Sequence, residues 1–126
     1  MSEENPGRLR RAVRRLASDE HEIEADDLQK KVEKDGAHPV ARCQQREVVT
    51  VLGTVRSMTL RPLAGTPTLE VELYDGSGTV MLTWLGRREI AGIQPGRQLR
   101  ATGRITTDGA QRVIFNPRYE LVLAAS

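Results

Sequence analysis

The stretch from Thr68 to Leu85, TLEVELYDGSGTVMLTWL, decides the fold of this chain. Apolar residues alternate with polar ones on both sides of the tetrapeptide Asp75-Gly76-Ser77-Gly78. Alternation with a period of two is typical of a strand that buries one face, and a Gly-containing break between two such runs is typical of a hairpin turn. The stretch therefore predicts a β-hairpin whose inward residues are Leu69, Val71, Leu73, Val80, Leu82 and Trp84.

A long strand is predicted before this hairpin, from about Val48 to Leu60. Gly53 lies inside it, and a glycine at such a position often marks a bulge or a tight bend. That bend would let one strand contribute to two sides of a small barrel. Residues 61–67, RPLAGTP, predict a loop between the long strand and the hairpin.

Shorter segments complete the predicted sheet. Residues 86–93 leave room for one or two helical turns at most, and Pro95-Gly96 predicts a type II turn. A fourth strand then places Leu99, Ala101 and Ile105 inward, and Asp108-Gly109 predicts a two-residue hairpin. The fifth strand should run from Gln111 to Phe115, stop at Asn116-Pro117, and be followed by a short strand at 119–123. This order predicts a mainly β fold, a five-stranded OB-fold Greek-key barrel with an N-terminal helical extension.

The extension is strongly charged. Residues 8–17, RLRRAVRRLA, predict a basic amphipathic helix, and residues 19–34 place acids early and lysines late, which suits a second helix ended by Gly36. The arginine run has two interpretations: an anchor for an anionic surface, or a partner of the acids that follow it. We therefore expect residues 1–41 to form a charged helical extension and linker, and residues 42–126 to form the OB-fold domain.

Composition restricts the class of protein. The chain has 126 residues, enough for one core and an appendage, and no apolar run approaches membrane-spanning length. The N-terminus lacks the apolar segment of a secretory signal, and the lone Cys43 cannot form an internal disulfide, so we expect a cytoplasmic protein. Residues 47–126 hold nine arginines, no lysine and seven acids, a mild excess of positive charge that permits nucleic-acid binding.

Residues 47–122 resemble a known family of domains. They look like the wedge OB domain of RecG-like branch-migration helicases, and still more like stand-alone OB-fold nucleic-acid-binding proteins of the actinobacterial type. The resemblance is carried by Gly53, residues 74–78 (YDGSG), Pro95-Gly96, Gly103 and residues 116–120 (NPRYE). No helicase motor and no phosphate-cradling GxxxxGK[ST] loop occurs in the sequence, so the resemblance implies binding alone.

The candidate binding residues are the arginines of the β half, since guanidinium groups suit phosphates and stack on bases. They are Arg56, Arg61, Arg87, Arg88, Arg100, Arg104, Arg112 and Arg118, among which Arg56, Arg87, Arg88 and Arg104 form the preferred group. Tyr74 and Trp84 are the candidate stacking residues. Trp84 follows the inward register, so packing in the core is the alternative for it.

The sequence leaves two functions open. The first is a non-enzymatic protein that binds single-stranded or branched DNA, or RNA, through phosphates and with little sequence preference. The second is a protein-interaction module, because Glu70 and Glu72 share the face of Tyr74 and carboxylates repel phosphate. In that case the N-terminal helices could also contact a protein partner.

Catalytic and metal sites have little support in the sequence. His21, His38 and Cys43 lack the paired spacing of metal ligands, so no metal or other cofactor is expected. Asp75 and Asp108 lie in Asp-Gly turns that already explain them. We therefore expect no enzymatic activity.

Overall fold

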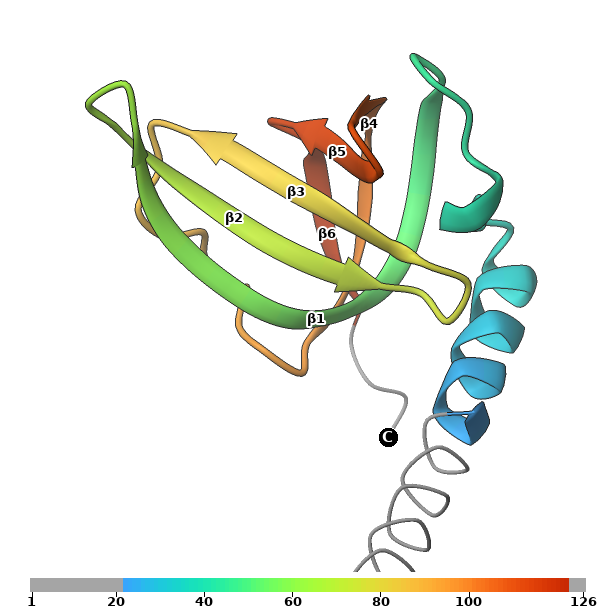
Figure 1. Ribbon diagram of the computed structural model, residues 1–126. Coiled ribbons are helices and arrows are strands. Elements are labelled where there is room, and N and C mark those ends of the chain that lie inside the picture. Colours follow the sequence, from blue (N-terminus) through green and yellow to red (C-terminus); the bar gives the residue numbers. More distant parts are fainter. Residues whose placement is uncertain (1–21, 123–126) are drawn as a thin grey trace, which may run out of the picture.

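The computed structural model describes residues 22–122. A helix spans residues 22–35 and is followed by the short 3₁₀ turn η1 (Val40–Arg42). Six strands follow (Figure 1): β1 (Val48–Leu63), β2 (Thr66–Tyr74), β3 (Thr79–Leu85), β4 (Gln98–Asp108), β5 (Gln111–Phe115) and β6 (Arg118–Val122). The predicted basic helix at 8–17 lies outside the described residues.

Five of the strands close into a barrel. Along the sheet β1 pairs with β2, β2 with β3, β3 with β5 and β5 with β4, and a further pairing of β1 with β4 completes the ring. The β3–β5 pair is parallel and the others are antiparallel. β6 follows the break at Asn116-Pro117 and continues along β4. The predicted five-stranded ring is thus present, with β6 as an additional strand.

β1 belongs to both sides of the barrel, as the sequence predicts. Val48–Thr54 pair with β4, and Thr54–Leu63 pair with β2. At the change of partner, a Cβ on Gly53 would lie 2.6 Å from the carbonyl oxygen of Tyr74, so only glycine fits there. The bulge itself lies three residues later, at Arg56, where the pairing shifts between Val55 and Ser57.

Two predicted connections differ from the structure. Residues 61–67 are not a loop, because β1 and β2 continue through them to a two-residue turn at Ala64-Gly65. Both turn residues have positive φ, 51° and 79°, as a tight hairpin turn of this kind requires. Residues 86–93 contain no helical turn, and Ile90 and Ile93 pack from them into the core. The turn predicted at Pro95-Gly96 is present, because the N–H of Arg97 donates to the carbonyl of Gln94 at 3.1 Å and Gly96 has φ at 90°.

The core confirms the predicted alternation. Val49, Val51 and Val55 of β1 are fully buried, together with the inward residues of the central hairpin and Leu99, Ala101 and Ile105 of β4. Val40 of η1 is also fully buried in this core. A segment that the sequence assigns to a linker therefore closes one end of the barrel.

The helix at residues 22–35 packs against the outside of β1. Val32, with Ala37 just after the helix, contacts Leu52 and forms a second, smaller apolar cluster. The helix ends at Gly36, as predicted, with φ at 79° and its N–H donating to the carbonyl of Val32 at 3.1 Å. Figure 1 shows this helix and η1 side by side at one end of the barrel, next to the β2–β3 turn.

Candidate nucleic-acid interface

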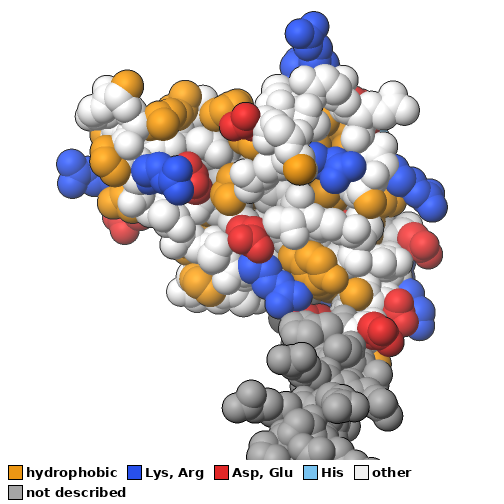
Figure 2. All heavy atoms as spheres, in the orientation of Figure 1, with side chains coloured by type: hydrophobic (Ala, Val, Ile, Leu, Met, Phe, Trp, Pro, Cys, Tyr) orange, Lys and Arg blue, Asp and Glu red, His pale blue; other side chains and the backbone are white. Residues whose placement is uncertain are grey.

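The outer face of β2, β3 and β5 carries two of the exposed large apolar residues of the barrel wall, Leu85 and Phe115. Thr83 of β3 lies opposite Glu70 of β2 on one side and Phe115 of β5 on the other. Phe115 is 50% exposed and Leu85, two residues beyond Thr83, is 43% exposed. Figure 2 shows hydrophobic side chains in this part of the surface, with Lys and Arg side chains on both sides of them. An exposed aromatic ring between cations can stack on a base.

Phe115 is a site residue that the sequence reasoning missed. Its place at the end of the predicted fifth strand, beside Asn116-Pro117, was recognised, but its side was not assigned. In the structure Phe115 pairs with Thr83 in the parallel β3–β5 ladder, and its side chain is half exposed. Alternation from the buried Ile114 is the local signal that could have indicated it.

The two carboxylates of this face have partners on β1. Glu70 lies 3.7 Å from Nε of Arg61, and Glu72 accepts a hydrogen bond of 3.4 Å from the Ser57 hydroxyl. Arg61, a predicted site residue, therefore offsets the charge of Glu70. The β2 part of the face stays unfavourable for phosphate, because Glu72 has no cationic partner among the described residues.

Tyr74 and Arg56 lie together at the end of β2 that is next to the helix. The Arg56 guanidinium stacks over the Tyr74 ring at 4.4 Å from its centroid, and its Nη2 lies 3.3 Å from Oε1 of Glu24. One face of the tyrosine is therefore covered by an arginine that is itself paired with the helix. Both predicted site residues are engaged within the chain.

Trp84 is placed in the core and not on the outer face. Its side chain is 5% exposed, its Nε1–H donates to the carbonyl of Pro117 at 3.1 Å, and its ring meets Tyr119 edge to face. The indole is buried within the protein, so Trp84 packs in the core and is not available to stack on a base.

Arg100 is held by two carboxylates. Its Nε donates to Asp35 at 3.1 Å and its Nη1 donates to Glu120 at 3.1 Å. The hydrogen bond to Asp35 raises the pKa of Arg100, and the same bond lowers the pKa of Asp35. Arg100 of β4 thus connects the end of the helix to β6. Because two carboxylates offset its charge, Arg100 is a poor candidate for binding an anionic ligand.

Arg104 and Arg112 occur at the end of the barrel that η1 closes. Nη1 of Arg104 donates to the carbonyl of Arg46 at 2.6 Å, and Nη2 of Arg112 donates to the carbonyl of Ala41 at 3.2 Å. Their partners are neutral carbonyls in the segment 41–46, so both arginines keep their full charge. Arg42 and Arg46 in this segment are further cations that the sequence analysis left in the linker.

Arg87, Arg88 and Arg118 are exposed and form no ion pair with the described residues. Arg87 and Arg88 follow the end of β3, whereas Arg104 lies near the strand ends on the opposite side of the barrel. Ile114 of β5 lies between Leu82 of β3 and Ile105 of β4, so β5 separates Arg104 from β3 and from the residues that follow it. The preferred group of the sequence analysis is therefore divided between the two ends of the face.

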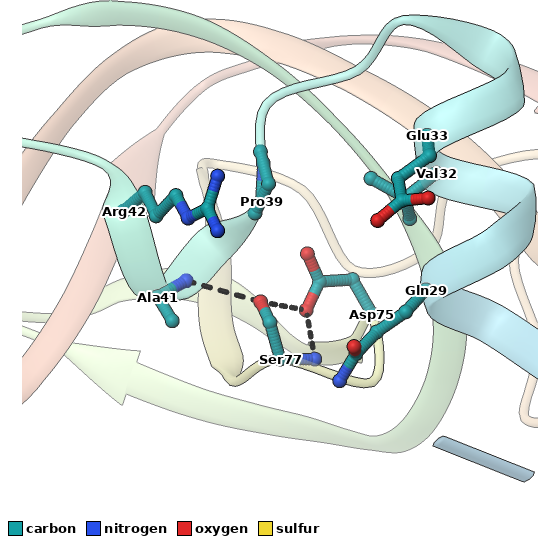
Figure 3. Close-up of a pocket in the computed structure, with 8 residues that line it drawn as sticks. All are labelled: Gln29, Val32, Glu33, Pro39, Ala41, Arg42, Asp75 and Ser77. Carbon is teal, nitrogen blue, oxygen red and sulfur yellow. Dashed lines mark hydrogen bonds between the residues drawn. The ribbon is translucent and has the colours of Figure 1, made fainter. Parts of the chain in front are cut away.

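A shallow pocket of about 120 Å³ lies between the helix and η1 (Figure 3), with Asp75 and Ser77 at its base. Asp75 is 1% exposed, and its carboxylate accepts hydrogen bonds from the backbone N–H of Val40 at 2.8 Å, of Ser77 at 2.9 Å and of Gly78 at 3.0 Å. The Ser77 hydroxyl donates to it as well. Asp75 therefore holds the β2–β3 turn and η1 together, and its acceptor sites are occupied within the protein.

Other kinds of site are not found within residues 22–122. No group of His, Cys, Asp and Glu there could hold a metal ion, and no helix there is long and apolar enough to cross a membrane. Cys43, a residue of the segment 41–46, is buried in the core, and its burial raises the pKa of the thiol to about 11. A thiol in this state is a poor nucleophile at neutral pH.

Similar folds occur in solved structures. The HINb domain of p204 matches with a TM-score of 0.58 and 13% identity over 72% of this chain. RecG bound to a three-way DNA junction matches with 0.50 and 23% over 62%, and a Replication Protein A heterotrimer bound to ssDNA with 0.50 and 15% over 67%. This chain has the OB fold. The match spans less than two thirds of each of those chains, namely 49%, 11% and 63%.

The OB fold confirms the predicted fold class, and RecG is among the structures that share it. No protein-family model matches the sequence, and no curated protein matches it. The likeness at these identities concerns the fold and not the activity.

Proposed function

We propose that this chain is a non-enzymatic, cytoplasmic protein that binds single-stranded or branched DNA in preference to RNA, through phosphates and with little sequence preference. The observation that carries the proposal is the exposed Phe115 ring on the outer face of an OB barrel, with arginines at both ends of that face. Stacking of a base on an aromatic ring contributes about 1–3 kcal/mol and tolerates any base.

The arginines supply the second part of the proposal. Arg87 and Arg88 lie beyond the end of β3, and Arg104 and Arg112 lie at the opposite end, so a strand that crosses Phe115 would meet cations on both sides. Phosphate contacts of this kind position a strand and carry no sequence information. Weak sequence preference follows from this combination of stacking and charge.

The similar structures support the same function. RecG is described as bound to a three-way DNA junction, and the Replication Protein A heterotrimer as bound to ssDNA. This chain shares a fold with part of each of these DNA-bound proteins, and it carries an exposed ring and arginines on that fold.

The test measures binding of a labelled twelve-nucleotide oligo-dT and of a labelled three-way DNA junction. Fluorescence anisotropy monitors the binding at low and at moderate salt. We expect binding that weakens steeply with salt. Phe115→Ala should weaken binding of oligo-dT about tenfold, the loss of roughly one stacked base. Ile23→Ala, which truncates a somewhat more exposed apolar side chain on the helix, is the control and should leave affinity unchanged.

Two results would count against the proposal. Failure of the wild-type protein to bind either DNA at low salt would overturn it. Recovery of a single protein in a 1:1 complex, with no DNA affinity, would favour the alternative of an interaction module, for which the same exposed Leu85 and Phe115 could serve as the contact surface.

A further inference from the structure

Four arginines come together around the end of the barrel that η1 closes. We call Arg42, Arg46, Arg104 and Arg112 the arginine collar. The first two belong to the segment 41–46, and the other two belong to β4 and β5. The hydrogen bonds from Arg104 to the Arg46 carbonyl and from Arg112 to the Ala41 carbonyl place these two side chains against the backbone of the segment that carries Arg42 and Arg46.

The segment that carries Arg42 and Arg46 is fixed on several sides. The Gln45 side-chain oxygen accepts hydrogen bonds from the backbone N–H of Thr107 at 2.6 Å and from its hydroxyl at 2.7 Å. The N–H of Arg46 donates to the carbonyl of Ile105 at 2.7 Å. The backbone of the collar is therefore ordered before any ligand arrives, which reduces the entropy that binding costs.

The chemistry of the collar suits phosphate. A guanidinium has five N–H donors, and Arg104 and Arg112 each use one of them on a carbonyl, so most donors remain. Arg42 and Arg46 form no ion pair with the described residues. Asp108 is the last residue of β4 and Glu47 directly follows the segment 41–46, so these stretches contain four arginines of the collar and two carboxylates.

Two other carboxylates lie near the collar. The Asp75 carboxylate is buried and fully hydrogen-bonded to the β2–β3 turn and η1, and Glu33 of the helix lines the same shallow pocket as Arg42 without forming an ion pair. Neither carboxylate forms an ion pair with an arginine of the collar.

We infer that the arginine collar is a phosphate-binding site and that the nucleic-acid strand runs along β5, from Phe115 to the collar, and not across β2. This inference rests on the proposed function. Arg112 and Phe115 are three residues apart on β5, roughly 10 Å along the strand, and this odd spacing places their side chains on opposite faces. The bound strand would therefore leave the outer face at the Gln111 end of β5 to reach Arg112, and the ~4 to 16 nucleotides that one OB fold holds are long enough for this span. A path across β2 would bring phosphates over Glu70 and Glu72, whereas the path along β5 avoids them.

The experiment measures how the binding constant of oligo-dT depends on salt. Each phosphate contact to a single strand contributes about 0.7 to the slope of log K against log salt. Arg42→Ala/Arg46→Ala should therefore make the slope shallower by about 1.4. The double variant Lys30→Ala/Arg97→Ala removes two exposed charges of the described region away from β5 and should leave the slope unchanged. Arg42→Lys/Arg46→Lys should keep the wild-type slope, and it also controls for any loss of folding.

An abasic twelve-nucleotide strand distinguishes the contribution of Phe115 from that of the collar, because it has phosphates and no bases to stack. We expect the wild-type protein to bind it, Phe115→Ala to bind it equally well, and Arg42→Ala/Arg46→Ala to lose most of that affinity. If the collar variant binds oligo-dT with the wild-type slope, the inference is wrong and the proposed function stands. If the wild-type protein binds no DNA at all, the proposed function fails, and the inference fails with it.

Discussion

Two segments attach to the barrel from its N-terminal side, and they use their arginine partners in opposite ways. The helix at 22–35 is held by ion pairs, Arg56 with Glu24 and Arg100 with Asp35. The segment 41–46 is held by hydrogen bonds from Arg104 and Arg112 to backbone carbonyls. The first attachment neutralises its arginines and the second leaves them charged. Whether an arginine is free to bind an anionic ligand therefore depends on the group to which it is bonded, a carboxylate or a neutral carbonyl, more than on its exposure.

The largest expected effect on stability comes from removing Asp75, which anchors the segment 41–46 to the β2–β3 turn through η1. Asp75→Ala leaves the donors of Val40, Ser77 and Gly78 without their buried acceptor. We expect the free energy of unfolding to fall by about 3 kcal/mol, since hydrogen bonds to a charged group contribute about 1.5–3 kcal/mol each and not all of them are lost independently. Urea denaturation measures this loss.

A second readout of that variant is the reactivity of Cys43. The Cys43 side chain points from this segment into the core, and burial raises the pKa of its thiol to about 11. The thiol should therefore react slowly with a thiol reagent at pH 8 in the wild-type protein. Asp75→Ala should speed the reaction by loosening the segment. Ser77→Ala keeps the carboxylate and should change both readouts much less. Equal stability of Asp75→Ala and the wild type would show that η1 does not depend on this anchor.

The next effect concerns the attachment of the helix. A Cβ at Gly76 would clash with the carbonyl oxygen of Ala25, and the residue has φ at 89°. Gly76→Ala should therefore lower stability by about 2 kcal/mol through strain and through displacement of the helix. Hydrogen exchange should speed up in residues 22–35 more than in the barrel strands.

Gly109→Ala is the matched control, because Gly109 has φ at 65° and its Cβ would meet nothing within 4 Å. It introduces similar backbone strain without contact to the helix. If both variants lose the same stability and the exchange of residues 22–35 stays slow in Gly76→Ala, the close contact between the helix and the β2–β3 turn is not important.

The smallest expected effect is the loss of the Arg100 ion pair, whose contribution to stability should depend on pH. Arg100→Ala should lower stability at pH 7 by about 1 kcal/mol, since partly exposed ion pairs contribute little. Arg100 lowers the pKa of Asp35 below its ordinary value of 3.8, so this contribution is present above that value and is lost as the pH falls through the pKa of the folded state.

The stabilities of Arg100→Ala and the wild type should therefore converge in acid, as measured by urea denaturation between pH 7 and 2.5. Arg104→Ala loses a bond to a carbonyl, which does not titrate, so its deficit should not change over the same range. A constant deficit for Arg100→Ala would mean that its role is packing and not charge.

The strands could be predicted because their signal is local. Alternation in Thr68–Leu85 and in β4 fixed which residues face the core, and Gly53 marked the change of partner in β1. The turn at Ala64-Gly65 was missed because alanine rarely adopts a φ of 51°, and two flanking prolines made a loop the more natural interpretation.

The site was harder to predict than the fold. Arg42 and Arg46 lie far from Arg104 and Arg112 in the sequence, and only the folded contacts between the segment 41–46 and the strands unite them. Likewise, no local pattern shows that Arg100 faces Asp35 across 65 positions. Long-range pairing decides which charges are used within the chain, and one sequence alone does not contain that information in a readable form.

The sharing of β1 between β2 and β4 has a consequence for how the protein can be divided. Each half of this 16-residue strand completes a different ladder, so a cut near Gly53 would leave two fragments, each with an open edge and half a core. The barrel should thus melt as one cooperative unit. Engineered insertions belong at the exposed Gly109-Ala110 tip, where no ladder is interrupted.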